Sequence, residues 1–98
     1  MNANLVELTA RLLETGGLRH TPAGLPSLQL RLAHRGPQTE AGRPRQVECE
    51  VEGQVFGELA ARMATLDVGV ELACKGFLDR KSARNPQLVL HVTEYEID

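Results

Sequence analysis

The chain has 98 residues, of which 42% are hydrophobic and 24% are charged, and its formal net charge at pH 7 is −2. These values predict one small globular domain over residues 1-98, and the negative total excludes a histone-like protein that binds nucleic acid by net charge alone. The first residues lack the positive region of a secretory signal, and no segment approaches the roughly 18 apolar residues of a membrane span. We therefore expect a cytoplasmic protein with no membrane partner.

The first predicted element is a strand over 4–13. Apolar residues occupy every second position of this segment, at Val6, Leu8, Ala10 and Leu12. A period of two predicts a strand with one buried face. Leu5 and Leu13 fall on the otherwise polar parity, so we expect part of the second face to be covered, and the strand is a candidate for pairing with a second chain. The sequence Thr-Pro-Ala-Gly at 21–24 then predicts a turn.

Two further strands are predicted on either side of a polar stretch. The first covers 28–35, with apolar residues at even positions. The second covers 45–52, where Val47, Cys49 and Val51 are expected to point inward and Glu48 and its even-numbered neighbours outward. The stretch 36–44 between them holds two prolines and two glycines. It predicts a mobile loop that is too long for a tight hairpin.

The hydrophobic period changes after the third strand. Between 55 and 66, Val55, Leu59 and Met63 recur every four residues, which predicts a short amphipathic helix. Alternation resumes over 70–78 and again over 88–97, so two more strands are expected. Gly76 lies inside the first of these and predicts a bend or bulge.

The expected order is three strands, one helix and two strands. This is the order of an OB-fold, a five-stranded Greek-key barrel, with its helix between strands 3 and 4. We therefore predict an all-β chain that forms a single OB-fold domain. An SH3-like barrel would lack the helix, and an α+β sandwich stays as the alternative.

The sequence contains no motif for catalysis or metal binding. A glycine-rich phosphate loop before a helix, Cys-x-x-Cys and His-Glu-x-x-His are all missing. The three histidines are far apart and are interpreted as surface or structural residues. Cys49 and Cys74 fall within alternating segments and predict reduced core thiols, with a disulfide or a metal pair as the alternative. We therefore predict that the protein is not an enzyme and holds no cofactor.

Positive charge gathers in two places on this acidic chain. Residues 19–45 contain five arginines and one acid, and the segment 80–84 adds three cations. In an OB-fold, the face of strands two and three and the loop between strands four and five bind oligonucleotides. The coincidence predicts a nucleic-acid surface. The alternative is that each cation simply keeps a strand end soluble.

Several short segments also carry a family resemblance through their order and spacing: Thr21-Pro22-Ala23-Gly24-Leu25-Pro26, His34-Arg35, Glu40-Ala41-Gly42, Arg45-Gln46, Gly76-Phe77-Leu78 and Leu88-Val89-Leu90-His91. They resemble the primosomal replication protein N (PriB) family, over nearly the whole chain. The wider relatives are the bacterial single-stranded-DNA-binding proteins, which share the OB-fold. The resemblance implies a cytoplasmic homodimer without enzymatic activity that binds single-stranded DNA. It also implies a role in replication restart, in which the protein assists the primosomal helicase PriA in reloading the replicative helicase.

The resemblance also implies which residues contact DNA. Carried over by position, the family's DNA-contacting cations correspond to Arg19, Arg35 and Arg45, and its lysine-rich loop corresponds to Arg80, Lys81 and Arg84. The family has aromatic residues where this chain has Arg43 and Glu48. Stacking on aromatic rings contributes about 1–3 kcal/mol per base in single-strand binders, so their loss implies weak, salt-dependent binding. Arg43 could stack in place of one lost ring, but a guanidinium in a mobile loop is a poor substitute for it.

Two functions follow from these expectations. The first is a replication-restart protein that binds single-stranded DNA through these cations. The second is an adaptor whose OB surface mainly contacts the helicase, with vestigial DNA binding, and it is motivated by the missing aromatic residues.

Overall fold

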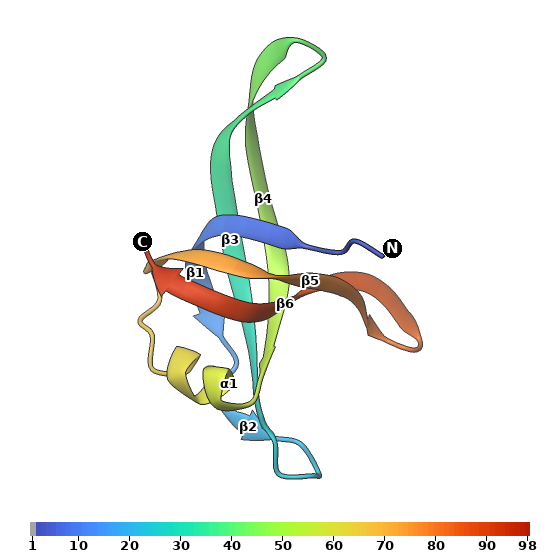
Figure 1. Cartoon of the computed structure of the whole chain (residues 1–98). Helices are drawn as coiled ribbons and strands as arrows, with labels where there is room; N and C mark the ends of the chain where they lie inside the picture. Colours follow the sequence, from blue (N-terminus) through green and yellow to red (C-terminus); the bar gives the residue numbers. More distant parts are fainter. Residues whose placement is uncertain (1) are drawn as a thin grey trace.

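The computed structural model describes residues 2–98, and its strands wind into a barrel with two projecting hairpins (Figure 1). The elements are β1 (Val6–Thr15), β2 (Arg19–His20), β3 (Pro26–Glu40), β4 (Arg43–Phe56), α1 (Glu58–Met63), β5 (Glu71–Ser82) and β6 (Asn85–Ile97). The sheet order is β1-β5-β6-β4-β3-β2, and β1 also pairs with β3, which closes the barrel. The expected five long strands and single helix are confirmed, and the α+β sandwich is wrong.

Alternating apolar residues fill the inside of the barrel. The largest fully buried side chains come from the five long strands and the helix: Leu12, Leu28, Leu32, Val55, Met63, Leu72, Cys74 and Leu90. Burying one such side chain stabilises the fold by about 1.5–3 kcal/mol. Helix α1 covers one end of the barrel with Ala60 and Met63. The even-numbered parity predicted for the first two strands is therefore the buried one.

The helix is shorter than expected. Val55 was predicted to open it, but Val55 belongs to β4, where it pairs with Leu28 and is fully buried. Gly57, at φ 80°, ends the strand and precedes the first helical residue. A backbone conformation of this kind suits glycine, which has no Cβ, and it breaks the four-residue spacing between Val55 and Leu59. Within residues 2–98, no helix is long and apolar enough to cross a membrane.

The predicted mobile loop at 36–44 is wrong, because this stretch belongs to a long hairpin. Strands β3 and β4 continue to a two-residue turn at Ala41 and Gly42, both with positive φ, as a type I′ turn requires. In such a hairpin the pair beside the turn is hydrogen-bonded and the pairs then alternate. Pro44 faces Thr39 and Pro37 faces Gln46. Both prolines thus lie in pairs that are not hydrogen-bonded, so their missing N–H groups cost no hydrogen bond between the strands. We call residues 35–48 the β3–β4 arm.

The two cysteines lie in different surroundings, and both are free. Cys74 is buried in the barrel, where desolvation raises the pKa of its thiol, so it stays protonated and unreactive. The prediction that Cys49 is a core thiol is wrong. Cys49 is exposed and pairs with His34 at the point where β3 and β4 leave the barrel, so the apolar core does not cover it. The disulfide alternative is wrong as well.

Strands β5 and β6 form the second projecting hairpin. Their turn is Ala83–Arg84, between the paired residues Ser82 and Asn85, so Arg80 and Lys81 lie at the end of β5 and Arg84 lies in the turn. We call residues 79–88 the β5–β6 tip. Gly76 lies at a shift of register between β5 and β6, and a Cβ there would overlap the carbonyl oxygen of His91. The bulge predicted at Gly76 is confirmed.

Candidate nucleic-acid interface

The outer face of β3 and β4 is a surface of paired charges. The strand register sets Arg31 opposite Glu52, Ala33 opposite Glu50 and Arg35 opposite Glu48. Because Leu30 and Leu32 between them point into the barrel, these residues point outward. The predicted outward position of Glu48 is confirmed. Each cation on this face therefore has a carboxylate as its direct cross-strand neighbour.

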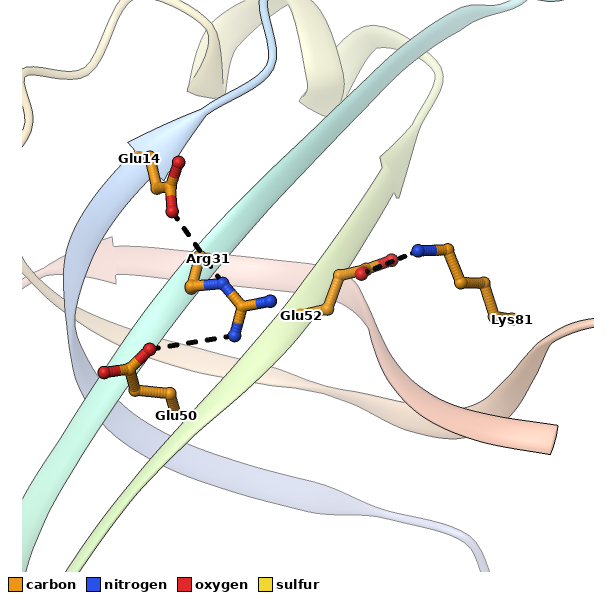
Figure 2. A network of polar contacts seen from close by, with 5 residues as sticks. All are labelled: Glu14, Arg31, Glu50, Glu52 and Lys81. Atoms are coloured by element: carbon orange, nitrogen blue, oxygen red, sulfur yellow. Dashed lines mark hydrogen bonds and ion pairs between the residues drawn. The ribbon is translucent and has the colours of Figure 1, made fainter. Parts of the chain in front are cut away.

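Arg31 makes two of the ion pairs on this face, although the sequence did not predict it as a DNA contact. Figure 2 shows its guanidinium between two carboxylates, with Nε 3.8 Å from Glu14 Oε1 and Nη1 3.7 Å from Glu50 Oε1. Glu14 comes from β1, so the pairs link three strands. Exposed pairs of this length contribute at most about 1 kcal/mol each. Their main consequence is that the charge of Arg31 is already compensated.

Lys81 links the β5–β6 tip to the same face. Its Nζ donates a hydrogen bond to Glu52 Oε1 at 3.0 Å (Figure 2). The Glu52 side chain is only 14% exposed, so this pair is the most shielded ion pair of the surface. Shielding from water strengthens an ion pair, because the effective dielectric is lower there. The contact therefore helps to hold the tip beside the outer face of β4.

The β3–β4 arm carries three of the predicted cations on two faces. Arg35 Nε lies 3.1 Å from Glu48 Oε1, and Arg45 Nη1 donates to Glu40 Oε1 at 2.6 Å. Side chains alternate along a strand pair, so Arg35 lies on one face while Arg43 and Arg45 share the parity of the other. The arm therefore carries arginines on both faces, but Arg35 is balanced by Glu48 on its face, and two of the three arginines are ion-paired.

The remaining predicted cations belong to separate places. Arg19 is in β2, and Figure 1 shows β2 at the opposite end of the barrel from the turn of the arm. Arg80 and Arg84 are exposed on the β5–β6 tip. Among residues 2–98, none of Arg19, Arg43, Arg80 and Arg84 makes an ion pair. The fold brings Arg80, Lys81 and Arg84 together and keeps Arg19 apart from the arm.

A row of three rings, which was not predicted from the sequence, also lies on the outside of the barrel. Phe77 of β5 stacks on His91 of β6 with ring centroids 4.9 Å apart and an interplanar angle of 3°. Phe56 of β4 lies on His91 at 6.1 Å and 27°. The only sequence signal was that Phe56 and Phe77 are the two phenylalanines of the chain. Their meeting depends on barrel closure, which no local pattern shows.

The histidines and acids do not form a metal site. His20, His34 and His91 belong to β2, β3 and β6, and the His34 ring donates from Nδ1 to the Thr9 carbonyl oxygen at 2.7 Å. In the part of the chain that the structure describes, no three His, Cys, Asp or Glu side chains gather closely enough to hold a metal ion.

Comparison with known proteins identifies the family. Residues 4–94 match the model of a family described as another single-strand binding protein family. The replication restart protein PriB of Bordetella pertussis is 42% identical over 91 residues, which cover 93% of this chain and 85% of that protein. The chain belongs to the PriB family of single-strand binding proteins. PriB of Nitrosomonas europaea is 33% identical over 99% of this chain and 90% of its own length.

Solved structures agree with the PriB assignment. PriB of Ralstonia solanacearum superposes with a TM-score of 0.91 and 35% identity over 98% of both chains. A small single-stranded DNA-binding protein of Streptomyces coelicolor reaches a TM-score of 0.76 at 18% identity, covering 100% of this chain and 95% of its own, which shows the shared fold. The predicted OB-fold and family resemblance are therefore confirmed. The expectation that the chain is not an enzyme agrees with this family.

Proposed function

We propose that this chain is a replication-restart accessory protein that binds single-stranded DNA and assists the primosomal helicase PriA in reloading the replicative helicase. The observation that carries the proposal is the nearly full-length similarity to proteins named replication restart protein PriB, at 42% identity in the Bordetella pertussis relative. The proposal places the chain in the cytoplasm as a homodimer of one OB-fold domain over 1-98. Leu5, beside the β1 strand suggested for pairing, is 72% exposed, which leaves it available to a second copy.

The proposed DNA contacts are the cations of the two hairpins and β2: Arg19, Arg35, Arg43, Arg45, Arg80, Lys81 and Arg84. Guanidinium and ammonium groups bind phosphate oxygens without reading the base sequence. Arg19, Arg43, Arg80 and Arg84 make no ion pair among residues 2–98, so they offer the strongest attraction. Arg35, Arg45 and Lys81 must exchange an internal carboxylate for a phosphate, so their net gain is smaller.

The first expected result concerns salt. Binding of a labelled oligonucleotide, followed by fluorescence anisotropy, should weaken steeply as the salt concentration rises and depend little on base sequence. The variant Arg80→Ala/Arg84→Ala should reduce the slope of log affinity against log salt by about 1.4, since each single-strand phosphate contact contributes about 0.7. The control Arg62→Ala/Lys75→Ala removes the same charge from α1 and from β5 beside β1. Binding that does not respond to salt would contradict the electrostatic mechanism.

A second function is favoured by the internal ion pairs of the arm. Arg35 and Arg45 are already held by Glu48 and Glu40, at 3.1 Å and 2.6 Å, so the arm displays alternating charge that suits a charged protein surface as well as phosphate. We propose as the alternative that the arm is an adaptor surface for the helicase.

Charge reversal on the arm separates the two functions. For Arg35→Glu/Arg45→Glu, DNA affinity and stimulation of the helicase are measured on the same preparation. If the arm binds DNA, both quantities fall together, because added carboxylates repel phosphate. If the arm is an adaptor, stimulation is lost while DNA affinity changes less than twofold.

A further inference from the structure

The row formed by Phe56, His91 and Phe77 is built by the closure of the barrel. His91 lies opposite Phe77 in the antiparallel β5–β6 register and opposite Gln54 in the parallel β4–β6 register. Phe56 follows Gln54 by two residues, so it points to the same side of β4. Three strands thus place three rings side by side on one outer surface, with His91 in the middle.

Gly76 brings the rings close together. Its missing side chain lets the β5 backbone approach the His91 carbonyl group, where a Cβ would lie 2.8 Å from the His91 carbonyl carbon. Phe77 directly follows Gly76 and lies opposite His91, and its ring is almost parallel to the His91 ring. The two strands thus bring the rings face to face in the absence of a ligand.

The outer rings of the row remain available to solvent. Phe56 is 44% exposed and Phe77 is 39% exposed, and they line a shallow hollow of about 340 Å³ together with Gln54, Leu59 and Thr93. Phenyl rings on a surface cost solvation free energy unless something covers them. A planar apolar ligand that stacks on a ring would remove this cost. The donor groups of Gln54 and Thr93 already bond within the chain, so only their oxygen atoms offer hydrogen-bond acceptors to such a ligand.

The surroundings of the row indicate which planar ligand this is. On β5, Phe77 and Lys81 both point outward. On β4, Glu52 and Phe56 both point outward as well. Lys81 bonds to Glu52, so the ion pair and the rings lie on the same outer surface. The basic β5–β6 tip, with Arg80 and Arg84, continues from the same strand. A row of aromatic rings beside a basic hairpin combines base stacking with phosphate attraction, which is the combination used for single-stranded nucleic acid.

We propose that Phe56 and Phe77, supported by His91, form a stacking subsite for an unpaired base of single-stranded DNA. The subsite would supply the stacking that, by the family resemblance, is lost at Arg43 and Glu48. It deepens the proposed function and rests on it. The base stacks on an exposed phenyl face, and its phosphates extend toward the β5–β6 tip.

The test compares an oligo(dT) with an abasic oligonucleotide of the same length and charge. Both are measured by fluorescence anisotropy against the full chain and the variants Phe56→Leu and Phe77→Leu, which keep an apolar side chain but remove the ring. The unmodified chain should bind oligo(dT) at least fivefold more tightly than the abasic strand. Each variant should lose most of this preference while its affinity for the abasic strand stays unchanged.

The control is Val68→Ala, which alters an exposed apolar residue away from the row. Thermal unfolding confirms that each variant is folded, and Phe56→Tyr, which keeps a ring, should restore the preference for bases. If the unmodified chain binds oligo(dT) but both leucine variants keep the full preference, the subsite is overturned and the proposed function stands. If the unmodified chain binds neither oligonucleotide, both are overturned.

Discussion

Replacing Gly76 with alanine should lower the stability of the fold by at least about 3 kcal/mol, which is large for a domain of this size. A Cβ at this position would overlap the carbonyl oxygen of His91 and lie 3.1 Å from the Val92 Cα. These are backbone atoms of β6, so no side chain can rotate away. The two strands would have to separate at the bulge, which would open the barrel. Thermal unfolding followed by circular dichroism should show a decrease of at least about 12 °C in Tm.

Two other glycines provide a graded control for this result. A Cβ at Gly53 would lie 2.5 Å from Leu30 Cδ1, the end of a flexible side chain, so Gly53→Ala should be destabilising by less than Gly76→Ala. A Cβ at Gly16 would make ordinary contacts at 3.6 Å with Gln29, so Gly16→Ala should change Tm little. A Gly76→Ala protein that melts at the temperature of Gly16→Ala would show that β5 does not approach β6 as described.

Removing the carboxylates of the outer face should strengthen DNA binding at least tenfold. In the variant Glu48→Gln/Glu50→Gln/Glu52→Gln, Arg35 and Lys81 lose their ion-pair partners, and Arg31 keeps only the longer contact with Glu14 at 3.8 Å. The three cations then become available to phosphates. The slope of log affinity against log salt should become steeper by about 2, at roughly 0.7 for each new contact. Anisotropy titrations at several salt concentrations measure both quantities.

The matched control removes three exposed carboxylates elsewhere, in Glu58→Gln/Glu94→Gln/Glu96→Gln. It changes the net charge by the same amount, so it measures the general attraction of a less acidic protein. An equal gain in both variants would assign the effect to net charge and not to the outer face. No gain in the first variant would mean that DNA uses a different surface.

The strand positions followed from the sequence wherever one face was buried inside the barrel. Leu28, Leu30 and Leu32 have the predicted parity because a buried face demands a period of two. The same alternation gave a wrong prediction for Cys49. It shows on which face of the strand a side chain lies, but not whether other residues cover that face. The spacing also gave a wrong prediction for Val55. Val55 and Leu59 are four residues apart, as in a helix, but Val55 belongs to β4 and Leu59 to α1, with Gly57 between the two elements.

The candidate site was predictable only as a set of charges. The clusters at Arg35–Arg45 and Arg80–Arg84 are visible in the sequence, and the fold places them on two hairpins. Their pairing partners were not visible, because Glu52 meets Lys81 and Glu14 meets Arg31 only after strands far apart in the chain pair. The same holds for Phe56 and Phe77, which the parallel contact of β4 with β6 brings to one surface.

The arm of β3 and β4 has a further consequence for the protein in a crowded solution. Beyond the barrel, β3 pairs only with β4, so both outer edges of the arm present backbone groups that another extended chain could join. Exposed edges of this kind promote aggregation by edge-to-edge pairing. Pro37 and Pro44 stand where the amide of each strand would point outward, and proline has no N–H to offer. The two prolines therefore protect a long, isolated hairpin against unwanted sheet growth.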